Sequence, residues 1–367
     1  VLAVLLTVSV GVGQGSAQGA TLAPWSDFPL VGEALTISNT SALGGTGSTD
    51  AAVAYNAQNG EYLVVWVQQA VRGLTSELFG QRMDRGGTLV GDAFRLTDSV
   101  GSGGETGAAH PEVVHCDVCD AFLVVYESDR HTVGNRQVYG RIVSDTGELI
   151  GEEVRISTGG HEAFRPAIAT DPVQGRHLVV WEQNAGPFIV DIDIFGQMVE
   201  TLAGSIVAVG SPVRVSRMSD PASNRTATGP DVTWNSLARE FLVVWQSDGR
   251  GLPYQTTEIF AQRIADSGEE VGVDDFAVSS MSADGDEHAA IEAAVTTDPR
   301  SGGFFVFWSG DGAGLPNDRF EVFVQTLDGA ADLVGPARQV SNADLAGATA
   351  RAPYPVAASA NGRTTVA

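Results

Sequence analysis

Lysine is absent from this sequence of 367 residues, and all 21 basic residues are arginine. The 45 acidic residues outnumber them and give a formal net charge of -24 at pH 7. A strongly acidic surface repels the phosphate backbone of DNA and RNA, so we expect no nucleic-acid partner. The same charge favours solubility outside the cell.

Long hydrophobic runs are also missing. The apolar segment at residues 1–12 is shorter than the roughly 20 residues needed to cross a bilayer, and small and polar residues follow it at 13–20. This pattern is typical of a secretory signal with a small-residue cleavage site. We therefore predict a signal peptide over residues 1–20 and a secreted or cell-surface mature chain, residues 21–367, without a membrane span.

Cysteine is scarce, and both copies lie in the motif Cys116-Asp117-Val118-Cys119. The motif offers two of the four ligands of a structural zinc ion, and no second pair in the sequence completes the set. A thioredoxin-like redox pair would need a βαβ setting, which the sequence does not indicate. In an oxidising compartment we expect a disulfide between Cys116 and Cys119 across a hairpin turn, with two free thiols as the alternative.

A repeat is the main positive feature of the chain. Five apolar strand patterns each end in an aromatic residue, called here the anchor aromatic, and the intervals between anchors are 60, 55, 64 and 63 residues; the anchors are Trp66, Tyr126, Trp181, Trp245 and Trp308. One short strand pattern precedes each anchor and two follow it. These segments are rich in β-branched and aromatic residues and show no helical period, so the fold class is all-β.

Repeats of four antiparallel strands bury their faces by stacking, and radial stacking gives a β-propeller. A tandem array of β-sandwiches would need about 100 residues per unit. We predict a β-propeller of four-stranded antiparallel blades, about 60 residues each, with five complete blades and a truncated sixth that begins at Pro355. Residues 34–38 match a fourth strand and are expected to complete the last blade. The anchor aromatics are expected to pack between blades.

The succession of an aromatic-ended Val-Val-Trp strand, a segment of the type Ile-Phe-Gly-Gln-Arg, and then Gly and a Val-Ser or Val-Asn strand resembles repeats of large secreted or surface bacterial proteins. Such proteins often carry calcium-binding repeats beside these units. The resemblance covers nearly all of residues 33–367 and implies no defined activity. The glycine-aspartate-rich nonapeptides of the calcium-binding repeats do not occur in the sequence.

Candidate binding residues follow from aligning the repeats on the anchor. The long loops should emerge on one rim of the propeller, where loops on a rigid scaffold commonly carry function. The position sixteen residues before each anchor, where the innermost strand begins, holds Asp50, His110, Arg165, Gly229 and Glu292. Glu112 and Asp231 lie two residues further on. We expect these side chains to surround the mouth of the central channel and to bind a cation or a polar ligand.

Aspartates in glycine-rich loops are weaker candidates for calcium ligands, and they are Asp248, Asp284, Asp286 and Asp311. None of them has the spacing of an EF-hand loop. We expect no cofactor other than possible calcium.

Catalytic motifs are missing as well, because the sequence has no G-x-S-x-G elbow, H-E-x-x-H helix, P-loop or dinucleotide fingerprint. The first expectation is therefore a non-catalytic extracellular binding or adhesion module that holds a glycan or a surface protein on the long-loop face. The alternative is a propeller enzyme, glycoside hydrolase or lyase-like, that uses carboxylates at the channel mouth on extracellular polysaccharide. A second alternative is a structural spacer of a larger surface protein.

Overall fold

The computed structural model is built from β-strands alone over the part of the chain that it describes. That part comprises residues 36–38, 45–70, 76–98, 107–132, 134–185, 191–218, 225–249, 252, 256–281, 288–311, 320–341, 355, 357–360 and 363–366. The predicted signal peptide lies outside the described residues. No helix among the described residues is long and apolar enough to cross a membrane.

The strands form five four-stranded antiparallel sheets, in each of which strands that follow one another in sequence are neighbours. Blade 1 contains β1 (Gly45–Asn56), β2 (Glu61–Ala70), β3 (Ser76–Asp84) and β4 (Leu89–Arg95). Blade 2 contains β5 (Ala108–Cys116), β6 (Ala121–Ser128), β7 (Gln137–Ser144) and β8 (Leu149–Arg155). Blade 3 contains β9 (Ala163–Asp171), β10 (Arg176–Asn184), β11 (Ile192–Leu202) and β12 (Ser205–Arg214).

Blade 4 contains β13 (Ala227–Asn235), β14 (Glu240–Ser247), β15 (Glu258–Ala265) and β16 (Glu270–Ala277). Blade 5 contains β17 (Ala290–Thr297), β18 (Phe304–Gly310), β19 (Glu321–Leu327) and β20 (Leu333–Gln339). A two-stranded sheet follows, made of β21 (Ala357–Ala360) and β22 (Arg363–Val366). The predicted all-β fold with five complete four-stranded antiparallel blades is confirmed, and the two-stranded sheet lies where a sixth blade is predicted to begin.

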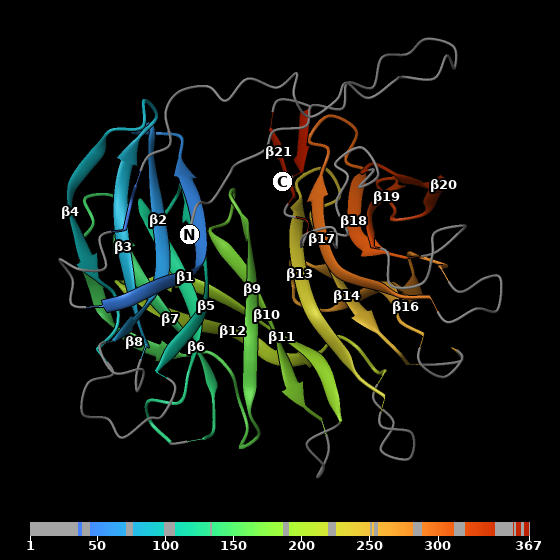
Figure 1. The fold of residues 1–367 in the computed structure, drawn as a ribbon, viewed down its shortest axis with the longest axis horizontal. Coiled ribbons are helices and arrows are strands. Elements are labelled where there is room, and N and C mark those ends of the chain that lie inside the picture. Colours follow the sequence, from blue (N-terminus) through green and yellow to red (C-terminus); the bar gives the residue numbers. More distant parts are fainter. Residues whose placement is uncertain are drawn as a thin grey trace.

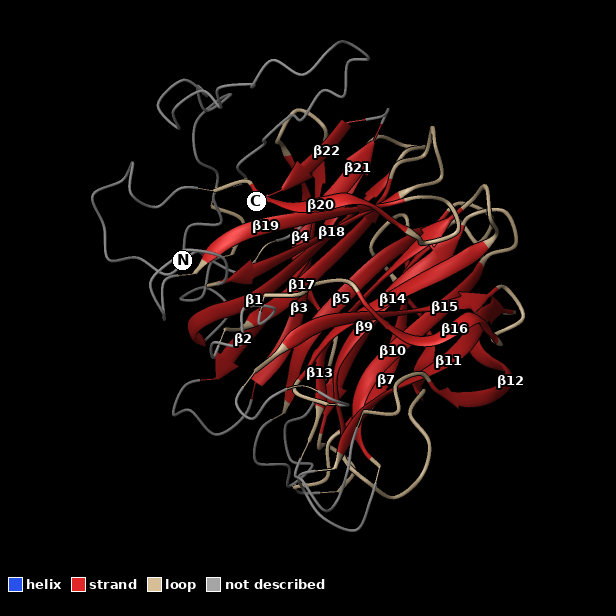
Figure 2. Cartoon of the chain, turned by 90° about the vertical axis from the view of Figure 1, so that its right-hand side faces the viewer, coloured by secondary structure: helices blue, strands red, loops and turns tan. Residues whose placement is uncertain are grey.

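The first strand of each blade lies innermost. Each contacts the first strand of the next blade, in the order β1, β5, β9, β13, β17 and β21. Figure 1 shows the outer strands β4 and β20 at opposite sides of the molecule, and Figure 2 shows the strands of neighbouring blades running alongside one another. The second strands are the most buried, as in β6, where every residue is buried, whereas the outer strand β8 is mostly exposed or half-buried.

The anchor aromatics pack between blades. Tyr126, Trp181, Trp245 and Trp308 are fully buried, and Trp66 is nearly so. Each of the first four belongs to a core cluster that also contains residues of the preceding blade, for example Trp181 with Val138 of blade 2. Because large aromatic side chains bury the most apolar surface per residue, these positions hold adjacent sheets together.

The turn between the first and second strands has the same design in four blades. An Asn or Asp at its start accepts a hydrogen bond of 2.8 to 3.0 Å from the amide two residues later; these residues are Asn56, Asp171, Asn235 and Asp298. This is the Asx turn that such side chains favour. Blade 2 differs, because Cys116 stands at this position and forms a disulfide with Cys119, with the two Cα atoms 5.2 Å apart.

The expected closing strand at residues 34–38 is not seen where the structure describes it. Residues 36–38 adopt no regular secondary structure, and residues 34 and 35 lie outside the described part. A short β-type sequence forms a strand only when another strand pairs with its backbone, so propensity alone does not make a strand.

Candidate functional site

Each innermost strand of blades 1 to 5 contains a β-bulge sixteen residues before the anchor aromatic, where its pairing with the second strand shifts register. The bulged residues have positive φ angles of 46 to 63°, and they are Asp50, His110, Arg165, Gly229 and Glu292. Four of these five residues are not glycine, and each such residue in the left-handed region costs on the order of 1 kcal/mol. Bulges re-aim side chains near functional sites.

The bulge amides of three blades are held by the residue that follows the anchor aromatic of the preceding blade. Glu127 accepts a hydrogen bond of 2.6 Å from the Arg165 amide, and Glu182 accepts one of 2.8 Å from the Gly229 amide. Gln246 accepts one of 2.6 Å from the Glu292 amide. The sequence analysis missed these residues, although the signal was present: a polar residue directly after an otherwise apolar strand.

Glu127 also binds the side chain of His110. Its Oε2 atom lies 3.3 Å from His110 Nδ1, and its Oε1 atom accepts a hydrogen bond of 3.1 Å from Arg136. The contact with Glu127 raises the pKa of His110, against the opposing effect of burial. Burial raises the pKa of Glu127, but the contacts with His110, the Arg165 amide and Arg136 outweigh it, so the net shift is downward.

Glu182 sits in a similar position one blade further on. Its Oε1 atom lies 3.6 Å from the guanidinium of Arg165, and burial raises its pKa although the Gly229 amide and Arg165 oppose the shift. The half-exposed Arg165 side chain therefore lies over the second strand of its own blade. Its positive charge is close enough to act on the carboxyl groups of Glu182 and Glu292.

The side chains at the bulge positions lie close enough together for their charges to shift one another's pKa values. The charge of Asp50 raises the pKa of His110, and the charge of Arg165 lowers it. Arg165 also lowers the pKa of Glu292, which burial raises. The place of these side chains around one mouth of the propeller, and their role in ligand binding, stay predictions.

A cavity of about 670 Å³ runs along the innermost strands of blades 2 to 5. Among the described residues that line it, Glu112 of β5 and Asp231 of β13 are the carboxylates, and the remainder are mainly alanine, valine, threonine and proline. The same repeat position holds alanine in the other three blades, namely Ala52, Ala167 and Ala294. Two acidic groups therefore replace alanine on the cavity wall.

The two carboxyl groups have different proton affinities. Burial and the negative charge of Asp231 raise the pKa of Glu112 to about 8, although His110 opposes the shift. Glu112 is exposed to the solvent in the cavity, but the surrounding protein replaces much of the bulk water that would otherwise stabilise its charge. This loss of solvation accounts for the upward direction of the pKa shift. Burial raises the pKa of Asp231 to about 6, against hydrogen bonds from the amides of Val295 and Val232 at 2.7 and 2.8 Å.

The aspartates predicted as calcium ligands have backbone partners where they are described. Asp248 accepts a hydrogen bond of 2.8 Å from the Thr226 amide, and Asp311 accepts one of 2.7 Å from the Ala289 amide. Each therefore fixes the start of its own blade's innermost strand. Asp284 and Asp286 lie outside the described residues. Calcium binding at these loops stays a prediction.

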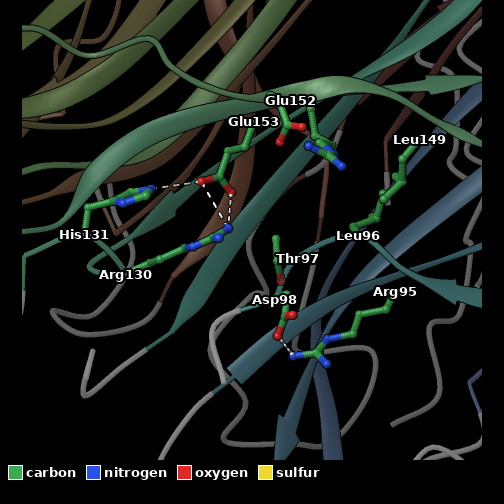
Figure 3. A pocket seen from close by; sticks show the side chains of 10 residues that line it. Arg95, Leu96, Thr97, Asp98, Arg130, His131, Leu149, Glu152 and Glu153 are labelled. Atoms are coloured by element: carbon green, nitrogen blue, oxygen red, sulfur yellow. Dashed lines mark hydrogen bonds and ion pairs between the residues drawn. The ribbon is translucent and has the colours of Figure 1, made fainter. Parts of the chain in front are cut away.

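A second cavity, of about 330 Å³, lies at the periphery between the outer strands of blades 1 and 2. Figure 3 shows Glu153 between Arg130 and His131, each 3.3 Å away, and Arg95 paired with Asp98 at 3.0 Å. The hydroxyl of the anchor residue Tyr126 donates a hydrogen bond to Glu153. These charges pair mainly with one another, so the central cavity is the stronger candidate for chemistry.

No protein-family model matches the sequence, and the curated proteins contain no match to it. Several solved structures are similar to the chain at the level of fold. A thermostable family-43 glycoside hydrolase aligns with 81% of this chain and 96% of its own length, at 14% identity and a TM-score of 0.44. An alpha-L-arabinofuranosidase from Lactobacillus brevis aligns with 77% of this chain and 92% of its own length, at 10% identity and a TM-score of 0.44.

An endo-arabinase from Bacteroides thetaiotaomicron covers 75% of this chain and 92% of its own, at 13% identity and a TM-score of 0.43. At such identities the likeness concerns the fold alone. The expectation of a non-catalytic binding or adhesion module is contradicted by these neighbours, which are glycoside hydrolases. A likeness of fold does not by itself carry their activity over to this chain. The sequence pointed to a binding module because it contains no linear catalytic motif.

Proposed function

We propose that the chain is a propeller enzyme that hydrolyses glycosidic bonds in a polysaccharide outside the cell. The observation that carries the proposal is the pair Glu112 and Asp231, which share one cavity with pKa values of about 8 and about 6. At neutral pH, Glu112 keeps its proton while Asp231 is largely ionised. Glycoside hydrolysis requires one protonated and one ionised carboxyl group, and different surroundings can set the two pKa values apart in this way.

In the proposed reaction Glu112 donates its proton to the glycosidic oxygen as the bond to the anomeric carbon breaks. Asp231 takes a proton from the water that attacks that carbon, so one water is consumed per bond. The strand β9 lies between β5 and β13 in the order of innermost strands, so the two carboxyl groups come from blades that are not adjacent. Direct attack by water gives inversion at the anomeric carbon.

The mouth residues suit a sugar substrate. Asp50, His110, Arg165 and Glu292 offer charged donors and acceptors for hydroxyl groups, and side chains of neighbouring blades fix the bulged backbone at Arg165 and Glu292. The cavity volume of about 670 Å³ falls in the usual range for small-molecule sites and accommodates a few sugar rings. The predicted signal peptide supports action on extracellular polysaccharide.

The test is release of reducing ends from a panel of plant and bacterial polysaccharides by the purified chain. The variant Glu112→Gln keeps the shape of the side chain but has no proton to donate, so hydrolysis should fall by roughly 10² to 10⁴-fold. Asp92→Asn, an exposed change on the outer strand β4, is the matched control and should leave the rate unchanged. Full activity of Glu112→Gln, or no hydrolysis of any polysaccharide by the unaltered chain, would refute the proposal.

A further inference from the structure

We infer that Cys116, Cys119 and His177 form a redox-gated binding site for a soft divalent cation of the zinc class, at the junction of blades 2 and 3. The two sulfur atoms and one ring nitrogen of His177 all lie within 4.8 Å of one another. The site is separate from the central pair of carboxylates and does not depend on the proposed hydrolysis. Sequence alone offered two ligands, and the fold supplies the third.

His177 has an available nitrogen. The side chain is fully buried on β10, and its Nδ1 atom lies 2.9 Å from the hydroxyl oxygen of Thr170. Its Nε2 atom is buried without a hydrogen-bond partner. Histidine ligands commonly use one nitrogen for the metal while a neighbouring group fixes the other, and Thr170 occupies that second role here.

Two of the three ligands, His177 and Cys116, are departures from the repeat. The position of His177, four residues before the anchor aromatic, holds a phenyl or phenol ring in every other blade, namely Tyr62, Phe122, Phe241 and Phe304. The position of Cys116 holds the Asn or Asp of the Asx turn in every other blade. An aromatic ring satisfies the packing at position 177, so packing does not explain an imidazole with an unpartnered nitrogen. The two departures occur in different blades and meet in space.

A glycine leaves space for the sulfurs. Gly175, in the turn before β10, has a φ of 65°, and a side chain there would come within 3.4 Å of Cys116 Sγ and 3.3 Å of Cys119 Sγ. The turn of blade 3 is therefore shaped to lie against the cysteine motif. Cys119 is half-buried, so solvent can supply a fourth ligand.

The disulfide closes the site, because metal binding requires thiolates. A reductant must supply two electrons to break the S–S bond. A dithiol gives up its two protons to the cysteine thiolates and becomes a disulfide, whereas a phosphine becomes a phosphine oxide with water supplying the oxygen and the two protons. The cation then displaces both thiol protons and binds two thiolates and His177 Nε2. Zinc–sulfur bonds of about 2.3 Å put the sulfurs about 3.8 Å apart, which the C-x-x-C spacing permits.

The experiment titrates the full chain with Co²⁺ as the optical probe, with and without reduction by tris(2-carboxyethyl)phosphine. The reduced chain should bind one equivalent with thiolate-to-cobalt charge-transfer absorption and tetrahedral ligand-field bands, and Zn²⁺ should displace it. The oxidised chain should show neither signal. The variant His177→Phe, which uses the residue found at this position in three other blades, should fold normally and bind Co²⁺ at least tenfold more weakly.

A second variant removes one thiol ligand while keeping the fold of the turn. Cys116→Asn restores the Asx turn of the other blades and should abolish the charge-transfer band while circular dichroism stays unchanged. The inference is overturned if the reduced chain gives no charge-transfer band, or if His177→Phe binds Co²⁺ with unchanged affinity and spectrum.

Discussion

The carboxylate of Glu182 accepts a hydrogen bond of 2.8 Å from the backbone amide of Gly229, the bulged residue of the next blade. Glu182 is buried, so removing its acceptor leaves the amide without a partner. We expect Glu182→Ala to lower the free energy of unfolding by about 1 to 3 kcal/mol, measured by urea denaturation.

Glu182→Gln is the matched control, because Gln246 makes the equivalent bond in the next blade. It keeps the acceptor and should cost less than half as much. Equal losses for the two variants would show that the bond to Gly229 contributes little.

The activity proposed for the central cavity should have a bell-shaped dependence on pH. Asp231 must be ionised, so the rate should fall below its pKa of about 6, and Glu112 must be protonated, so the rate should fall above its pKa of about 8. Initial rates measured across this range check both limbs. A rate that rises steadily beyond pH 9 would contradict the role of Glu112 as the acid.

The raised pKa of Glu112 also has a consequence for stability. The folded chain holds this proton more tightly than the unfolded chain, whose ordinary pKa is 4.5, so stability should decline as the pH rises from 4.5 to about 8. Glu112→Gln removes this decline. Thermal unfolding midpoints of the two chains should therefore converge near pH 4 and separate towards pH 8, with the variant higher; a constant difference would exclude this explanation.

The contact between His110 and Glu127 predicts a histidine that stays protonated above its ordinary pKa of 6.5. Its stabilising contribution is present below that value and is lost as the pH rises through the raised pKa. Glu127→Gln should lower the pKa of His110, observed by NMR titration of the ring. His177, whose pKa burial lowers to about 4, is the internal control and should not respond.

Because the anchor aromatics pack between blades, truncating one of them should cause a large loss of stability. Trp245 is fully buried in the core cluster that joins blades 3 and 4. Trp245→Ala should lower the free energy of unfolding by about 3 to 5 kcal/mol. Leu237→Ala, at a turn residue that is 63% exposed, should change it by less than about 0.5 kcal/mol. Similar losses for the two variants would contradict the packing role of Trp245.

The repeat made the fold predictable, because strands of the same type recur with a fixed order and each anchor aromatic marks the second strand. Alignment on the anchor also selected the five bulge positions. It could not reveal their left-handed backbone, which sequence leaves open when the residue is Asp, His, Arg or Glu.

Contacts between blades were harder to predict. The bonds of Glu127 and Glu182 to bulge amides join residues 38 and 47 positions apart. The approach of His177 to the cysteine motif joins a strand of blade 3 to a turn of blade 2 that no local pattern connects. Residues 34–38 fit a strand by pattern, but propensity is decided by whether a partner strand is available.

The bulges give the mouth an unusual capacity for change. In three blades the bulge amide is fixed by a side chain of the preceding blade, and the residues at positions 50, 110, 165, 229 and 292 differ in charge and size while all five sheets keep four strands. A directed-evolution library confined to these five codons would therefore vary the lining of the mouth while sparing the scaffold. Asn, Asp and Gly should be over-represented among its stable members, since they tolerate the left-handed conformation best.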